Sequence, residues 1–266
     1  MNIKEQIAKI KAQGYDQIHA EARLCQDIII QALAKSKLNQ NVTIKGGVVM
    51  RSISKDVRRA TRDLDIDFIR YSLEDSHIDN FIDEINCLDC ISIRRIGDIE
   101  ELKQQDYHGK RIHIKISDSH GNSLISKIDL GVHKDLSIKQ EEYCFDICFT
   151  ETSTSLLINS KEQMFTEKLR SLLKFGSFST RYKDIFDLYY LSPLVDKKFL
   201  MLCFEKYIFN DTGMKENNLE DIIRRVTKTF ENSSYRRKLE TTETNWLNIE
   251  SNEILEGILH FFNEEI

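Results

Sequence analysis

The feature that most constrains the fold of this chain is a short run in which aspartates alternate with large apolar residues. Residues 63–69 read DLDIDFI. Because successive side chains of a strand point to opposite faces of a sheet, this pattern predicts a strand with its apolar residues in a core and Asp63, Asp65 and Asp67 together on the other face. Carboxylates this close raise one another's pKa, so this face requires a metal ion or basic groups to neutralise it.

A glycine pair precedes the acidic strand. Residues 42–47 read VTIKGG, an apolar strand that leads into Gly46 and Gly47, and a helical pattern begins at Val48. A glycine turn that opens a helix presents backbone N–H groups and the positive end of the helix dipole to an anion. The order of strand, glycine turn, helix and acidic strand therefore favours a phosphate-binding site beside the aspartates.

A second carboxylate-bearing strand is expected further along the chain. Residues 111–116 alternate strictly, residues 119–122 form a hairpin turn, and residues 124–132 alternate again with Asp129 near their middle. If the last of these strands lies beside the acidic strand, Asp63, Asp65 and Asp129 form an oxygen-ligand site for Mg²⁺ or Mn²⁺. The alternative is a structural role, in which arginines or backbone donors satisfy each carboxylate.

The remaining patterns predict an α/β (α+β) fold in two parts. Residues 1–155 are expected to form N-terminal helices and a mixed sheet, and residues 156–266 a helical lobe, because the periodicity is helical from residue 156 onward. Within that lobe, Ser160 and Gln163 form a capping box at the start of a helix that Gly176 ends. A second helix covers residues 181–191 and stops before Pro193.

The composition limits the classes of protein. The net charge of −5 argues against a chain that coats nucleic acid indiscriminately, and no apolar run approaches the ~20 residues of a membrane span. The N-terminus lacks the apolar segment of a secretion signal, and the six cysteines are expected to be reduced thiols, so we expect a cytoplasmic protein. One local patch for nucleic acid is predicted from five basic residues: Arg51, Lys55, Arg58, Arg59 and Arg62.

Two motifs resemble a known family. Lys45-Gly46-Gly47 followed by RATRDLD at residues 59–65 resembles the signature of the AbiEii/AbiGii-type nucleotidyltransferase toxins, a branch of the polymerase-β-like nucleotidyltransferase superfamily. EKLR at residues 167–170 and RYKDIFDL at residues 181–188 resemble its later helical motif. The resemblance covers roughly residues 40–191. This chain departs from the pattern at Val48, where members often have a small hydroxyl residue, and at Asp67, which adds a third carboxylate.

The resemblance implies a role for each matching residue. Asp63 and Asp65 would be catalytic and bind metal, and Asp129 stands where the superfamily often has a third carboxylate. The implied nucleotide-binding residues are Gly46, Gly47, Thr61, Lys168 and Arg181. The spacing of apolar residues in the helix that begins after Ser160 also places Lys168 at the edge of the buried stripe, with its ammonium free to meet phosphate. Asp184 and Asp187 lie three residues apart on one helical face, where they would orient Lys168 or Arg181, or Asp184 would act catalytically by accepting a proton from the attacking hydroxyl. The alternative is a salt bridge at the helix surface.

The implied activity is the transfer of a nucleotidyl group from an NTP to an acceptor hydroxyl, with Mg²⁺ or Mn²⁺ and release of pyrophosphate. The implied acceptor is RNA, at the 3′ end of tRNA, and the helical lobe would close the nucleotide cleft. The implied role is that of a toxin in a toxin–antitoxin or phage-defence pair, with a separately encoded antitoxin. Two alternatives are a non-catalytic nucleotide-binding regulator and a metal-dependent phosphodiesterase or nuclease.

Overall fold

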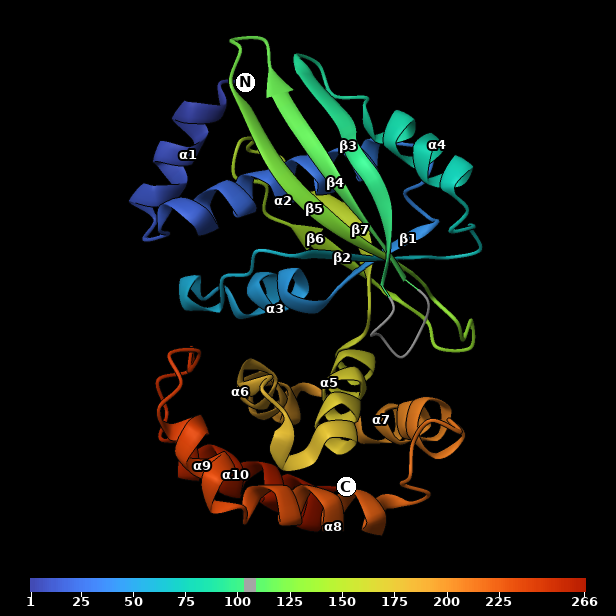
Figure 1. The fold of residues 1–266 in the computed structure, drawn as a ribbon, viewed down its shortest axis with the longest axis vertical. Coiled ribbons are helices and arrows are strands. Elements are labelled where there is room, and N and C mark those ends of the chain that lie inside the picture. Colours follow the sequence, from blue (N-terminus) through green and yellow to red (C-terminus); the bar gives the residue numbers. More distant parts are fainter. Residues whose placement is uncertain (103–108) are drawn as a thin grey trace. The chain divides into compact units, whose positions relative to one another are not determined.

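The structure, a computed structural model, describes residues 1–102 and 109–266 (Figure 1). The chain divides into two compact units, Met1–Asn159 and Ser160–Ile266. The boundary was expected between residues 155 and 156. It lies four residues later because Thr154–Ile158, whose latter part was expected to be helical, is a strand of the sheet.

Unit 1 is built on a mixed sheet. Among the described residues the sheet has seven strands in the order β3-β4-β5-β2-β1-β7-β6. The strands are β1 Val42–Lys45, β2 Leu64–Phe68, β3 Ile91–Leu102, β4 Gly109–Asp118, β5 Ser123–Val132, β6 Glu141–Phe145 and β7 Thr154–Ile158. β2 pairs antiparallel with β1 and parallel with β5, and β7 pairs parallel with β1. The predicted mixed α/β architecture is thus confirmed, and β2 lies near the middle of the sheet.

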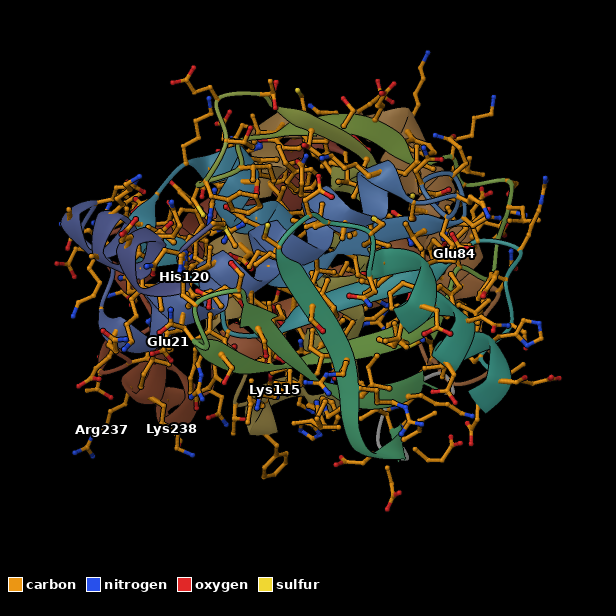
Figure 2. All side chains as sticks on the ribbon, turned by 90° about the horizontal axis from the view of Figure 1, so that it is seen from above. Glu21, Glu84, Lys115, His120, Arg237 and Lys238 are labelled. Carbon is orange, nitrogen blue, oxygen red and sulfur yellow. The ribbon has the colours of Figure 1, made fainter. Side chains whose placement is uncertain are left out.

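Helices pack against this sheet and fill the core of unit 1. They are α1 Ile3–Ala12, α2 Gln17–Lys35, α3 Gly46–Ser54 and α4 Asp75–Ile85, with a short 3-10 turn at Val57–Arg59. α2 contacts β5, β7 and α4, while α3 contacts β1 and β2. The apolar residues of β2, Leu64, Ile66 and Phe68, are buried as the alternation predicts. Charged side chains such as Glu21, Glu84 and Lys115 lie at the surface of the same unit (Figure 2).

Asp118 fastens the first helix to the sheet. Its carboxylate accepts hydrogen bonds from the backbone N–H of Ile3 at 2.9 Å, from those of His120 and Asn122, and from the Asn122 side chain. Burial opposes ionisation of this carboxyl, but the hydrogen bonds outweigh it and lower the pKa of Asp118.

Because the pKa of Asp118 is lowered in the folded state, its contribution to stability is present above the unfolded pKa of about 3.9 and is lost as the pH falls below it. Asp118→Ala is therefore expected to lower the melting temperature at pH 7 and to release α1 to proteolysis. Thermal melts of the variant and the parent should converge as the pH falls below about 4. An equal difference at both pH values would contradict this role for the ionised carboxylate.

Unit 2 is helical among its described residues. Its α-helices are α5 Lys161–Phe175, α6 Tyr182–Leu191, α7 Lys197–Phe204, α8 Leu219–Phe230, α9 Ser233–Glu240 and α10 Ser251–His260. Short 3-10 turns lie at Gly176–Phe178 and Ser192–Leu194, and π-helical turns at Glu205–Phe209 and Phe261–Glu265.

The predicted ends of α5 are confirmed. At its start the Gln163 N–H donates to Ser160 Oγ at 3.1 Å, and at its end Gly176 adopts φ +53°. Phe165 of this helix packs against Phe204, Phe261 and Phe262 in the core of unit 2. In the described part of the chain no helix has the length and apolar character needed to cross a membrane.

Candidate active site

Strand register brings the acidic residues of unit 1 together. Lys45 of β1 stands opposite Asp65 of β2, and Asp65 stands beside Asp129 of β5. Directly paired residues of neighbouring strands point to the same face of a sheet. Asp63 lies one residue before β2. The sheet thus places Asp65 and Asp129 side by side, as expected for neighbouring strands.

Asp65 is the most strongly perturbed carboxylate of this group. Burial is the main cause, and the charges of Asp129, Asp63 and Asp67 act in the same direction, while Lys45 opposes them. Together they raise the pKa of Asp65 to about 6. Among the described residues no cation lies within ion-pair distance of Asp65. A cation bound at this carboxylate would relieve both the burial and the repulsion.

Asp67 has a partner that the sequence did not reveal. Its carboxylate pairs with Lys45 Nζ at 2.7 Å, and both side chains are buried. The alternation within β2 does not specify this partner, because Lys45 is brought to Asp67 by the β1–β2 pairing. Asp67 is therefore a structural carboxylate that neutralises a buried lysine beside the site.

Two further carboxylates of the predicted metal site carry basic partners. Arg111 binds Asp129 with two parallel hydrogen bonds, from Nε at 2.7 Å and from Nη2 at 2.8 Å. Lys127 Nζ lies 2.9 Å from Asp63 Oδ1. The Asp129 pairing matches the structural alternative set out above, so a metal ligand role for Asp129 would require exchange with Arg111.

The described acidic residues supply oxygen atoms of the kind that bind Mg²⁺ or Mn²⁺, but they do not form a complete ion site in this structure. Mg²⁺ and Mn²⁺ prefer carboxylate oxygens, and Asp63 and Asp65 stand at alternate positions along the acidic strand, with Asp65 next to Asp129. In the described part of the chain, however, no three carboxylate, histidine or cysteine side chains converge closely enough to hold an ion. Asp63 pairs with Lys127, and Asp129 pairs with Arg111. Asp65 differs from both, because burial and the neighbouring aspartates raise its pKa.

The glycine turn packs directly against this strand. A Cβ on Gly46 would lie 2.4 Å from Asp65 Oδ2, and a Cβ on Gly47 would lie 2.5 Å from Thr61 Oγ1. Gly46 also has φ +66°, a left-handed conformation that favours glycine. α3 begins at Gly46, and no side chain caps its first N–H groups. The backbone at the start of α3 therefore lies in contact with Asp65 and Thr61.

Gly46→Ala is expected to reduce activity by at least about tenfold, because the added methyl group displaces Asp65 and costs a further ~1–2 kcal/mol in the left-handed conformation. Gly97→Ala is the matched control. Gly97 has nearly the same φ, +69°, but an added Cβ would meet nothing within 4 Å. Both variants should lose stability in thermal melts, and only Gly46→Ala should lose activity. Equal activities would contradict the role of the Gly46 contact.

A buried polar network supports the backbone of the acidic strand. Gln26 of α2 donates to the carbonyl oxygens of Thr61 at 3.0 Å and Asp63 at 3.3 Å. Arg51 of α3 donates to Gln26 Oε1 at 2.8 Å and lies 3.5 Å from Asp27. The sequence pattern does not indicate a role for Gln26 or Asp27, because both lie in a mostly apolar helical segment far from β2 in the chain.

The predicted basic patch is not a single surface. Arg51 and Arg59 are each only 3% exposed, and Arg58 is paired with Asp56. The prediction of one patch is wrong because a basic run in sequence does not distinguish a buried arginine from a solvated one. Only Lys55, Arg58 and Arg62 of this run are exposed to solvent.

In unit 2, the later motif forms a buried cluster of ionic groups. Lys168 Nζ lies 2.7 Å from Asp187 and 3.1 Å from Asp184. Trp246 Nε1 donates to Asp187 at 3.0 Å, and Arg181 Nε lies 2.9 Å from Asp184. The expected free ammonium at the edge of α5 is thus wrong, because α6 places two carboxylates against it. The expected orientation of Lys168 and Arg181 by the two aspartates matches this geometry.

A mixed sheet with a glycine turn packed on an acidic strand, joined to a helical unit with a buried lysine–aspartate cluster, has the features expected of a nucleotidyltransferase. The family model described as Nucleotidyl transferase AbiEii toxin, Type IV TA system, matches residues 28–248. The chain therefore belongs to this family of nucleotidyltransferase toxins, which confirms the resemblance seen in its sequence, and it is a nucleotidyltransferase.

Comparison with curated protein sequences gives no significant match. Among solved structures, the chain is similar to an antigenic nucleotidyltransferase-like protein from Paracoccidioides brasiliensis, with 17% sequence identity and a TM-score of 0.45. The similarity covers 84% of this chain and 93% of that one. A likeness this distant carries no argument about function.

Proposed function

We propose that the chain transfers a nucleotidyl group from an NTP to a hydroxyl group of RNA, with release of pyrophosphate. The family of nucleotidyltransferase toxins supports the transfer reaction and the existence of a separate antitoxin. The resemblance in sequence further suggests the 3′ end of tRNA as the acceptor, and the cytoplasm is the expected place of action. Growth arrest or phage defence would be the consequence of the modified acceptor.

One observation carries this proposal. The backbone of Gly46, at the start of α3, packs so closely against the carboxylate of Asp65 that an added methyl group would displace that carboxylate. Backbone N–H groups at a helix N-terminus bind phosphate, and carboxylates of this kind bind Mg²⁺. The two groups that a metal–triphosphate complex needs are therefore in contact within unit 1.

Different residues of unit 1 would bind the metal and the phosphates. Asp63 and Asp65 would hold Mg²⁺ or Mn²⁺, and Asp129 would join them by exchanging its bond with Arg111 for the metal. Gly46 and Gly47 would bind phosphate oxygens through their N–H groups. When bound, the metal would lower the pKa of the attacking hydroxyl and stabilise the charge on the departing pyrophosphate.

The residues of unit 2 would bind the nucleotide and accept a proton. Lys168 and Arg181 carry the positive charge for phosphate, and Asp184 contacts both of them. A lysine paired with carboxylates keeps its charge and a fixed direction, which suits an ammonium that must meet phosphate. Asp184 would accept the proton of the attacking hydroxyl.

Incubation of the purified chain with labelled NTPs, Mg²⁺ and total tRNA tests this reaction. The proposal predicts labelled RNA that is longer than the input on a sequencing gel. Shortened RNA would instead support a nuclease, and NTP binding by calorimetry without any labelled RNA would support a non-catalytic regulator. Either of these two results would contradict the proposed transfer.

A further inference from the structure

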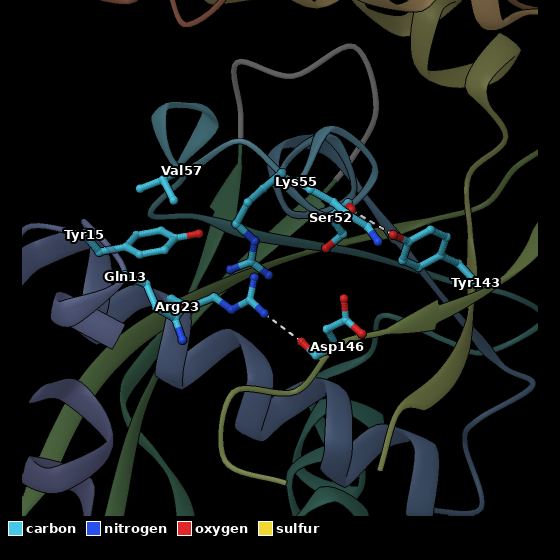
Figure 3. Close-up of a pocket in the computed structure, with 9 residues that line it drawn as sticks. Gln13, Tyr15, Arg23, Ser52, Lys55, Val57, Tyr143 and Asp146 are labelled. Atoms are coloured by element: carbon cyan, nitrogen blue, oxygen red, sulfur yellow. Dashed lines mark hydrogen bonds between the residues drawn. The ribbon is translucent and has the colours of Figure 1, made fainter. Parts of the chain in front are cut away.

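A pocket of about 240 Å³ lies in unit 1 at the far end of α3 from the glycine turn (Figure 3). Its walls come from four parts of unit 1. These are the segment between α1 and α2, the first turns of α2, the last turn of α3 with the residues after it, and β6 with the residue after it. The lining residues are Gln13, Tyr15, Arg23, Arg51, Ser52, Lys55, Val57, Tyr143 and Asp146. None of these residues has a role in the reaction proposed above.

Two guanidinium groups in the wall share one carboxylate. Arg23 Nε lies 2.8 Å from Asp27 Oδ2, and Arg51 Nη2 lies 3.5 Å from Asp27 Oδ1. Arg51 is 3% exposed, and a charged group buried to this extent is costly unless groups of opposite charge pair with it. Burial and the neighbouring charge of Arg23 lower the pKa of Arg51 to about 10, although Asp27 opposes them. A second anion near these arginines would relieve this repulsion.

Arg51 also has a donor left over. Its Nη1 donates to Gln26, but its Nε is buried and meets no hydrogen-bond acceptor among the described residues. A buried donor without an acceptor costs free energy, so the Arg51 guanidinium in the pocket wall is incompletely satisfied by the protein. Phosphate oxygens are such acceptors and match the planar fork of a guanidinium group.

The other groups of the wall set the charge of the occupant. Lys55 adds a third cation, and Tyr15 brings a phenol ring to the opposite side of Arg23 from Asp146 (Figure 3). Asp146 is the acidic residue of the wall, and its backbone carbonyl accepts a 2.6 Å hydrogen bond from Arg23 Nη2. With Asp27 behind the arginines, three cations face two carboxylates. The local charge is therefore positive.

We propose that this pocket binds a small phosphate-bearing anion at a site separate from the residues assigned to the metal and the nucleotide. The observations that carry it are the paired guanidinium groups, the unsatisfied buried donor of Arg51 and the volume of the pocket, which suits a phosphate or a pyrophosphate group. The proposal does not depend on the proposed transfer reaction.

The pocket is connected to the acidic strand by hydrogen bonds. Arg51 bonds Gln26, and Gln26 bonds the carbonyl oxygens of Thr61 and Asp63. An anion that fixes Arg51 therefore also holds Gln26 and, through it, the backbone beside Asp65. A phosphate-bearing molecule bound in the pocket would therefore restrain the backbone of the acidic strand.

Titration calorimetry of the full chain with pyrophosphate, inorganic phosphate and AMP, in EDTA, tests the site. Lys55→Gln and Arg23→Gln are each expected to weaken binding by about tenfold or more, because each removes a charged donor. Lys37→Gln is the matched control, on a side chain that is 88% exposed and does not line the pocket. Tighter binding of AMP identifies a phosphate ester as the occupant, and tighter binding of pyrophosphate or phosphate identifies a free anion.

A second arm separates this site from the nucleotide residues. Lys168→Gln should leave the affinity for pyrophosphate in EDTA unchanged, and the Gln26 side-chain amide signal in a ¹⁵N NMR spectrum should shift during the titration. The proposal is overturned if no small anion binds, if only RNA binds, or if Lys168→Gln abolishes binding while Lys55→Gln does not. Lys55 is exposed, so its variant keeps the test valid even if Arg23→Gln fails to fold.

Discussion

Replacing Asp65 with asparagine is expected to abolish nucleotidyl transfer, with a loss of about a thousandfold or more, while the fold is retained. Asparagine keeps the shape of the side chain but removes a carboxylate that would hold the metal, and metal stabilisation of a transition state amounts to several kcal/mol. The thermal stability of the variant, in contrast, should equal or exceed that of the parent. Burial and neighbouring aspartates raise the pKa of Asp65 to about 6, so its ionised form is disfavoured in the folded state at neutral pH.

The measurement combines RNA labelling with thermal melts at pH 7.5. Without metal, Asp65→Asn should melt at the same temperature as the parent or higher, and Mg²⁺ should raise the melting temperature of the parent alone. Asp98→Asn, on an exposed residue of β3, is the control and should match the parent in activity. An Asp65→Asn protein that labels RNA at the parent rate would remove Asp65 from the proposed mechanism.

Asp187→Asn is expected to lower the free energy of unfolding of unit 2 by about 3–5 kcal/mol. Asp187 is 0% exposed and lies 2.7 Å from the buried Lys168 ammonium. The variant removes one carboxylate partner of that ammonium, and an under-compensated buried charge is costly. Asparagine keeps an oxygen for Trp246 Nε1, so the lost charge is the main change. Urea denaturation followed by Trp246 fluorescence measures the effect.

The double variant Asp187→Leu with Lys168→Met separates structure from function. Removing both buried charges should recover much of the stability, since a buried ion pair often adds little over apolar side chains of similar size. If Lys168 binds phosphate, the double variant should still be inactive. A stable and active double variant would assign Lys168 a purely structural role, and an Asp187→Asn protein as stable as the parent would contradict the argument from burial.

Local patterns predicted much of the fold. The alternation of Leu64, Ile66 and Phe68 gave the acidic strand, and the capping residues Ser160 and Gln163 gave the start of α5. These signals are local, because a strand face and a helix cap depend on residues within a few positions. Strand β7 was missed because residues 156–158 form a short apolar run, which does not distinguish a buried strand from a buried helix.

The partners of the charged residues could not be predicted in the same way. Lys45 reaches Asp67 only because β1 and β2 pair in one register, and Arg111 reaches Asp129 across the β4–β5 pair. Such partners follow from strand order, which the alternation of single strands does not specify. For the same reason the sequence indicated an exposed ammonium at Lys168, whereas α6 supplies the carboxylate of Asp187.

The most direct test of nucleotidyl transfer follows the two ends of the triphosphate separately. The chain is incubated with Mg²⁺, tRNA and an NTP labelled either at the α-phosphate or at the γ-phosphate. The proposed reaction predicts that the α-label enters RNA and that the γ-label leaves as pyrophosphate, with both signals lost in Asp65→Asn. Transfer of the γ-label to RNA, or release of the γ-label as inorganic phosphate without any α-labelled RNA, would contradict the account.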